Sequence, residues 1–242
     1  TTLFRSLHRR QPELREQRGV GGVAAVAGGE QLVAIEDGIG AGHEAHRLDR
    51  FAQLAAAEGL EFAPSFAPDL VLGVATYALE LFRGAPPLDA LYVPIGLGSG
   101  ICGCILARDL LGLRTEIVGV QSEAAPAYAL SFAAGRVVET PSADTLADGM
   151  ACRQPQQLAL DMLRAGAARI VRVSDDEIRA AIRAYHEDTH NLAEGAGAAA
   201  LAALIQERQL NAGQRVAVVL SGANIDRAAL AELLRDETPA AA

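Results

Sequence analysis

The distribution of hydrophobic and polar residues predicts alternating strands and helices from about residue 50 onward. Short apolar runs, typical of buried strands, alternate with longer segments whose apolar side chains recur at helical spacing. The expected strands cover residues 91–95, 116–120, 170–173 and 216–220. The expected helices cover residues 51–58, 69–84, 101–111, 124–132, 156–165, 174–185 and 196–207. This order is typical of an α/β protein in which helices cover both faces of a parallel sheet.

Two helix starts carry polar residues that suit a cap. Asp69 precedes the apolar positions of the second helix and can accept hydrogen bonds from its first N–H groups. Ser174 and Glu177 have the spacing of a capping box. We therefore expect both helices to begin at these residues.

A glycine-rich loop interrupts the pattern directly after the first strand. Its residues are Gly96, Leu97, Gly98, Ser99 and Gly100. Glycine allows the main chain to approach a ligand closely, and the N-terminus of the next helix favours an anion. Ligands of parallel sheets bind at the carboxyl ends of the strands, where this loop and residues 221–224 both fall. The pattern predicts a phosphate site, with a tight turn that binds no ligand as the alternative.

Two further motifs allow other functions. Gly98-x-Gly100-x-x-Gly103 matches the dinucleotide fingerprint, so a nicotinamide-dependent oxidoreductase stays open as an alternative. His186 and His190 have the spacing of a zinc-protease helix. The flanking residues are largely charged, however, which indicates a solvent-exposed face. We expect two surface histidines there and no metal.

Composition limits the classes of partner. Half of the 242 residues are hydrophobic, and the formal net charge of −9 argues against a nucleic-acid partner. No apolar run is long enough to cross a membrane, and the first residues lack a secretory signal core, so we expect a cytoplasmic protein. The cysteines Cys102, Cys104 and Cys152 form no disulfide framework.

The chain contains no lysine. All 21 of its basic Lys and Arg residues are arginine. No side chain of this chain can therefore form a Schiff base with an aldehyde cofactor.

Six segments, in the same order, resemble the serine/threonine dehydratases, which are pyridoxal-phosphate enzymes related to serine racemase. The resemblance extends over about residues 50–235. It rests on the glycine loop and on the residues around Thr145, Ser174, Glu194 and Ser221. The segments are residues 68–76, 93–103, 145–149, 173–177, 194–198 and 220–224.

The resemblance implies a fold, a cofactor and an activity. The fold is the tryptophan-synthase-β type, and the cofactor is pyridoxal 5′-phosphate. The backbone N–H groups of the glycine loop would hold its phosphate, Ser221 would face its pyridine nitrogen, and Glu194 would lie near its ring. The implied reaction is the elimination of water from serine or threonine, which yields a 2-oxo acid and ammonia. A homodimer acting on a small amino acid is also implied.

Several family features are missing from the chain. The family's lysine in a Ser-Phe-Lys-type motif and its Ser-Ala-Gly-Asn-His-Gly loop have no counterpart, and Ala223 replaces a usual glycine. Some members bind a cation through acidic side chains where this chain has Gln121 and Ala127, so we expect no metal there. The chain therefore looks like a family member that has lost its N-terminal part, including the catalytic lysine. A non-catalytic remnant of the family stays open beside the ammonia-lyase.

The same family resemblance divides the chain into three parts. Residues 86–242 are expected to form the large cofactor-binding domain, and residues 48–85 the end of the small domain and the connection. Residues 1–47 show no clean periodicity, and we expect an irregular segment there, lost in part by truncation or altered by a shift of reading frame. Such a segment is expected to pack only loosely.

Overall fold

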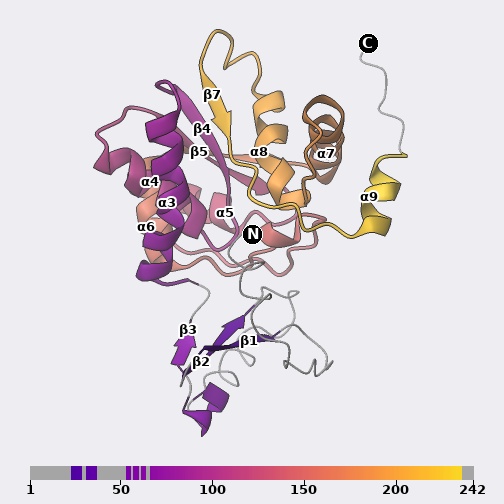
Figure 1. Cartoon of the computed structure of the whole chain (residues 1–242). Coiled ribbons are helices and arrows are strands. Elements are labelled where there is room, and N and C mark those ends of the chain that lie inside the picture. The colour runs from indigo at the N-terminus through magenta and orange to yellow at the C-terminus, as the bar shows by residue number, and fades with distance from the viewer. Residues whose placement is uncertain are drawn as a thin grey trace.

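The computed structural model describes residues 23–28, 31–36, 53–55, 57–59, 61–63 and 66–235 (Figure 1). From residue 66 onward, strands and helices alternate in the order that the sequence predicts. The helices are α3 (Pro68–Gly84), α4 (Ser99–Leu110), α5 (Ala127–Ala134), α6 (Gln157–Gly166), α7 (Asp175–Thr189), α8 (Gly195–Gln206) and α9 (Arg227–Leu233). A single 3-10 turn, η1 (Asp148–Met150), lies between α5 and α6.

A four-stranded parallel sheet forms the centre of this part of the chain. Its strands are β4 (Ala90–Pro94), β5 (Glu116–Ser122), β6 (Ala167–Val173) and β7 (Val216–Val218), in the order β6-β5-β4-β7. All three strand pairs are parallel, which confirms the sheet type expected from the sequence. Because the strands are parallel, the segments that follow β4 and β7 lie at the same edge of the sheet.

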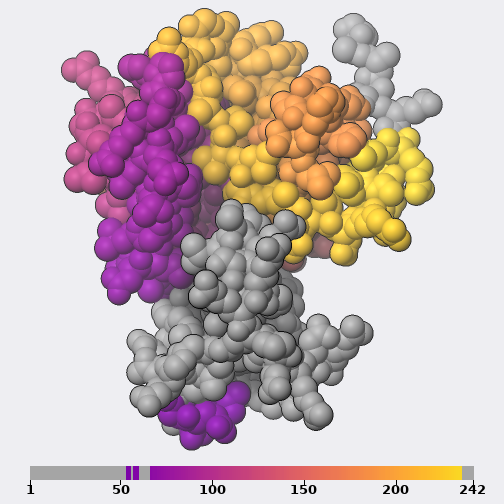
Figure 2. Space-filling model, in the orientation of Figure 1, coloured from indigo at the N-terminus to yellow at the C-terminus, as the bar shows by residue number. Residues whose placement is uncertain are grey.

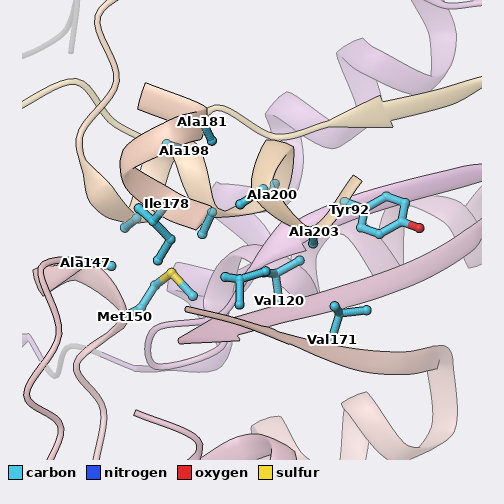
Figure 3. Packing of buried hydrophobic residues seen from close by; sticks show 14 of the residues in the cluster. Tyr92, Val120, Ala147, Met150, Val171, Ile178, Ala181, Ala198, Ala200 and Ala203 are labelled. Carbon is cyan, nitrogen blue, oxygen red and sulfur yellow. The ribbon is translucent and has the colours of Figure 1, made fainter. Parts of the chain in front are cut away.

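Alternate residues of the strands face two separate cores. In β4, Leu91 and Val93 belong to a core beneath α3, α4 and α6, whereas Tyr92 belongs to a core beneath α7 and α8. Figure 3 shows the second core, where Tyr92, Val120 and Met150 lie against alanines of α8. Side chains of a strand point alternately to opposite faces, so a sheet covered on both sides has apolar residues at every position.

Small residues allow α8 and α4 to approach their neighbours closely. Eight residues of α8, all glycine or alanine, are buried. In α4, a Cβ atom at Gly103 would lie 3.0 Å from the backbone of Ala75 in α3. Figure 1 shows α3, α4 and α6 on one side of the sheet and α7 and α8 on the other. Helix α3 forms the outer surface of its side (purple in Figure 2).

Three details of the helices differ from the expectations. Asp69 does not cap α3: the N-cap is Ala67, Pro68 takes the first helical position, and Asp69 lies in the first turn. This start suits proline, whose missing N–H group needs no partner there. Helix α5 begins only at Ala127, after Pro126. The short helix α9 was not expected. The capping box of α7, with Ser174 and Glu177, is confirmed.

The N-terminal part contains strands where the sequence shows no clear pattern. Strand β1 (Val23–Gly28) pairs antiparallel with β2 (Gln31–Glu36), and β2 pairs parallel with β3 (Glu61–Ala63). The described residues of the expected irregular segment 1–47 thus form two strands. They are rich in alanine, which favours strands weakly, so their pattern is faint. The expectation of loose packing concerns side chains outside the described residues.

The expected limit of the large domain at residue 86 also differs from the packing. Helix α3 ends at Gly84, yet its residues Val71 and Ala78 belong to the core shared with β4 and α4. The packing therefore groups α3 with the four-stranded sheet.

Candidate cofactor-phosphate site

The glycine loop joins the end of β4 to the start of α4 and leaves a row of free N–H groups. On its two sides, Ile95 N–H donates to Val120 O at 2.9 Å and Cys102 N–H donates to Gly98 O at 3.0 Å. Between them, the N–H groups of residues 96–101 have no acceptor within the part of the chain that the structure describes. A loop with six free donors at a helix N-terminus is suited to hold an anion. We call residues 96–101 the amide cradle.

Three carbonyl groups of the cradle, in contrast, are bound by the protein. Leu97 O accepts the hydroxyl of Tyr128 at 2.6 Å, Gly98 O accepts Cys102 N–H, and Gly100 O accepts the hydroxyl of Tyr77 at 3.4 Å. The Tyr128 hydroxyl also accepts Gln156 N–H at 3.0 Å. These contacts turn acceptors toward the protein and leave donors free, which is the polarity that a phosphate requires.

Two glycines of the cradle are required by its geometry. Gly98 is the N-cap of α4 and has φ 101°, a left-handed conformation that glycine adopts without strain. A Cβ atom on Gly98 would lie 2.9 Å from the Ala159 side chain and 3.3 Å from the Tyr128 hydroxyl. A Cβ atom on Gly96 would overlap the carbonyl oxygen of Gly149. A side chain at either position would force the loop to move.

The segment with Ser221 follows β7 and lies beside α8. Glu194, the N-cap of α8, donates its N–H to Gly222 O at 3.1 Å and accepts Asn224 N–H at 3.1 Å on its carboxylate. A Cβ atom on Gly222 would overlap this carboxylate, and one on Gly197 would overlap Gly222 O. These reciprocal contacts fix the backbone that directly follows Ser221.

Gly149 connects the two halves of the site. Its carbonyl oxygen lies against Gly96, and a Cβ atom on Gly149 would lie 3.0 Å from Ala196 and 3.9 Å from the Glu194 carboxylate. The structure therefore brings the cradle and the Glu194 carboxylate together around one residue. Ser221 itself is exposed at the adjoining edge of the sheet.

The other candidate residues do not form a second site. His186 and His190 are exposed on α7, which confirms their surface position. Within the described ranges, no three His, Cys, Asp or Glu side chains are grouped to hold a metal ion. Gln121 is buried, and its side-chain oxygen accepts Ala129 N–H at 2.8 Å.

The cysteines are structural in character. All three are buried. Burial, with a smaller contribution from neighbouring Cys104, raises the pKa of Cys102 to about 12. Burial raises the pKa of Cys104 to about 11, although its hydrogen bond with the Tyr77 hydroxyl opposes this. Thiols held neutral in this way are poor nucleophiles.

Several residues of the site could not be identified from the sequence. Tyr77 and Tyr128 hold carbonyls of the cradle, but both occur in helical patterns that indicate only core packing. Gly149 and the Thr145 segment were noticed only through the family resemblance. A tyrosine hydroxyl that bonds a distant carbonyl has no local sequence signature.

The site fits one part of pyridoxal phosphate and not another. Its free N–H groups are suited to hold the phosphate, and the exposed hydroxyl of Ser221 is available to a ring nitrogen. No residue of the chain can bind the aldehyde covalently, because the chain contains no lysine. The residues present therefore fit non-covalent binding through the phosphate.

Comparison with known proteins identifies the family. A family model described as pyridoxal-phosphate dependent enzyme matches residues 24–222. Phenylserine dehydratase of Ralstonia pickettii is 36% identical over 208 residues, which cover 85% of this chain and 62% of that protein. An L-threonine ammonia-lyase of Geobacter sulfurreducens is 37% identical over 169 residues, covering 69% of this chain and 42% of that protein.

Solved structures agree with this assignment. Threonine deaminase isoform 2 of Solanum lycopersicum has a TM-score of 0.72 at 27% identity, covering 75% of this chain and 54% of that chain. Maize serine racemase has a TM-score of 0.72 at 26% identity, covering 77% of this chain and 58% of that chain. The chain thus spans less than two thirds of the length of the relatives it matches.

These matches correct two expectations and confirm the main one. The nicotinamide alternative is not supported, since the fingerprint glycines lie within the residues that match the pyridoxal-phosphate family model. The resemblance also begins earlier than residue 50, because the family model already matches from residue 24. The fold class is confirmed: parallel sheet and covering helices are those of the structures matched. The chain belongs to the pyridoxal-phosphate dependent enzyme family of the threonine and serine dehydratases.

Proposed function

We propose that this chain binds pyridoxal phosphate non-covalently, with the phosphate held by the amide cradle. The observation that carries the proposal is the polarity of the loop. Six N–H groups are free of described acceptors, while the carbonyls of Leu97, Gly98 and Gly100 are bound by the protein. Each hydrogen bond from a neutral N–H group to a charged phosphate contributes roughly 1.5–3 kcal/mol.

The ring would be oriented by the segment that follows β7. Ser221 would place a neutral hydroxyl beside the pyridine nitrogen, and Glu194 holds the backbone of the following residues Gly222 and Asn224. When bound, pyridoxal phosphate supplies an electron sink for reactions at the α-carbon of an amino acid. A neutral partner leaves the ring nitrogen unprotonated, which suits elimination of a β-substituent.

The substrate class of the lineage follows from the names of the relatives. These are a phenylserine dehydratase, threonine ammonia-lyases and L-threo-3-hydroxyaspartate ammonia-lyases. The named amino acids share a hydroxyl group on the β-carbon. We assign β-hydroxy amino acids to this lineage as the substrate class, with water and then ammonia as the leaving groups.

The chain without lysine is expected to bind but not to deaminate. The experiment incubates the purified chain with pyridoxal phosphate and threonine or serine, and it measures 2-oxo acid formation and borohydride-stable adducts. We expect saturable binding, no 2-oxobutanoate and no adduct within the site. Formation of 2-oxobutanoate by this chain alone would contradict the non-catalytic part of the proposal. Absence of binding would contradict the proposal as a whole.

Assembly and location are proposed from the family. In the described residues, no helix is long and apolar enough to span a membrane. We propose a homodimer in the cytoplasm. Sedimentation of the purified chain measures its oligomeric state directly.

A further inference from the structure

The carboxylate of Asp175 gathers three donors from two segments near the site. Its Oδ1 accepts the Thr145 hydroxyl at 2.6 Å and the Ser122 hydroxyl at 3.3 Å, and its Oδ2 accepts Leu146 N–H at 2.9 Å. Asp175 is the first residue of α7 and is partly buried. The capping of α7 is already provided by Ser174 and Glu177. The contacts of Asp175 instead join the start of α7 to Ser122 and to residues 145–146.

The segment that Asp175 holds is the one that contacts the amide cradle. The Thr145 hydroxyl also accepts Ala147 N–H at 3.2 Å, so its own proton is directed to Asp175. A Cβ atom on Gly195 would lie 2.7 Å from the Cα of Ala147, which places this backbone directly on the start of α8. Two residues later, the carbonyl oxygen of Gly149 lies against Gly96.

We propose that Asp175 is a positioning residue for the amide cradle. Its carboxylate fixes residues 145–149, and this segment in turn sets the position of Gly96. Only the expected effect on phosphate binding rests on the proposed function. Its structural part concerns the connection from Asp175 to Gly96 and holds without a ligand.

The chemistry of the contact explains why a carboxylate is required. Both oxygens of Asp175 accept hydrogen bonds, and all three partners are donors. An asparagine at this position keeps an acceptor for Leu146 N–H only when its NH₂ group faces the Thr145 and Ser122 hydroxyls, which then lose the oxygen that accepts their protons. The Asp175→Asn variant therefore loosens residues 145–149 with little change in volume.

Two matched controls separate this role from general effects on α7. Asp176 is the next residue, its side chain is 92% exposed, and it pairs with Arg179 at 2.8 Å. Asp176→Asn removes the same charge from the same helix start and does not touch residues 145–149. At Thr145, Thr145→Val removes the hydroxyl and Thr145→Ser retains it.

The test measures amide signals of Gly96, Gly98 and Gly100 by NMR, and binding of pyridoxamine 5′-phosphate by calorimetry. This probe carries the phosphate and ring but no aldehyde, so it does not react with amines. We expect Asp175→Asn and Thr145→Val to shift the Gly96 signal and to weaken binding about fivefold. Asp176→Asn and Thr145→Ser are expected to leave both close to the unmodified chain.

The outcomes distinguish this inference from the proposed function. If the Gly96 signal is the same in Asp175→Asn and Asp176→Asn, Asp175 does not position the cradle. Unchanged affinity in Asp175→Asn, with the unmodified chain binding the probe, also overturns the inference. If the unmodified chain binds no probe while Asp175→Asn still shifts Gly96, the connection holds and the proposed function fails.

Discussion

The hydroxyl of Tyr128 in α5 donates a 2.6 Å hydrogen bond to the carbonyl oxygen of Leu97 in the amide cradle. The same hydroxyl accepts Gln156 N–H, so one buried oxygen joins three segments that lie far apart in the sequence. Tyr128 is fully buried, and burial raises the pKa of its phenol well above the usual value, so the hydroxyl remains a donor. The cradle thus depends on a side chain outside the glycine loop.

Removal of this hydroxyl is expected to affect both stability and binding. Tyr128→Phe leaves Leu97 O and Gln156 N–H without their partner, and an unsatisfied buried group costs roughly 1–3 kcal/mol. We expect the free energy of unfolding to fall by about this amount in urea titration. We also expect weaker binding of pyridoxamine 5′-phosphate, because Leu97 O is no longer held away from the ligand.

Tyr185 provides the matched control for this substitution. Its hydroxyl is also buried, but it has no hydrogen-bond partner among the described residues. Tyr185→Phe removes a buried polar group that has no such partner, so it is expected to leave stability unchanged or slightly increased. If Tyr128→Phe and Tyr185→Phe behave alike, the bond to Leu97 has no role in stability.

The sequence predicts the framework of the molecule well and its inner contacts poorly. The strands around Leu91 and Val118 and the glycine loop were recognisable, because apolar runs and glycines are local signals. The start of α3 was misplaced, since Asp69 and Pro68 both suit a helix start and only Pro68 fits the first position. The contacts of Tyr128 depend on how distant segments pack, which no single-sequence pattern records.

Ser221 is expected to contribute to ring binding and not to phosphate binding. Ser221→Ala removes one neutral hydrogen bond, worth roughly 0.5–1.5 kcal/mol. Titration calorimetry should therefore show weaker binding of pyridoxamine 5′-phosphate and unchanged binding of inorganic phosphate. Equal effects on both ligands would mean that Ser221 acts by disturbing the loop around Gly222.

The buried thiols predict a loss of stability at high pH. Burial raises the pKa of Cys102 from 9.0 to about 12 and that of Cys104 from 9.0 to about 11. The folded chain therefore holds these protons more tightly than the unfolded chain. The resulting stabilisation is complete below pH 9 and is lost as the pH rises toward 11 to 12.

This dependence is measured by urea unfolding at several pH values. Between pH 9 and 11, each thiol should lower the free energy of unfolding by up to about 1.4 kcal/mol per pH unit. Cys104→Ala should flatten the slope relative to the unmodified chain. A free energy of unfolding that stays constant from pH 9 to 11 would contradict the burial of these thiols.

The central claim is that the cradle binds the phosphate group, and glycine substitutions test it most directly. Gly98 and Gly112 both have positive φ, 101° and 64°, so alanine strains the backbone at each. A Cβ atom on Gly98 would crowd Ala159 and Tyr128, whereas one on Gly112 has no atom within 4 Å. Gly112→Ala is therefore a matched control that leaves the cradle intact.

The decisive measurement compares binding of pyridoxamine 5′-phosphate and pyridoxamine by calorimetry in the unmodified chain, Gly98→Ala and Gly112→Ala. We predict that the unmodified chain and Gly112→Ala bind the phosphorylated ligand more tightly than pyridoxamine, and that Gly98→Ala loses this preference. Equal affinity for both ligands in the unmodified chain, or a preference retained in Gly98→Ala, would contradict the assignment of the cradle as the phosphate site.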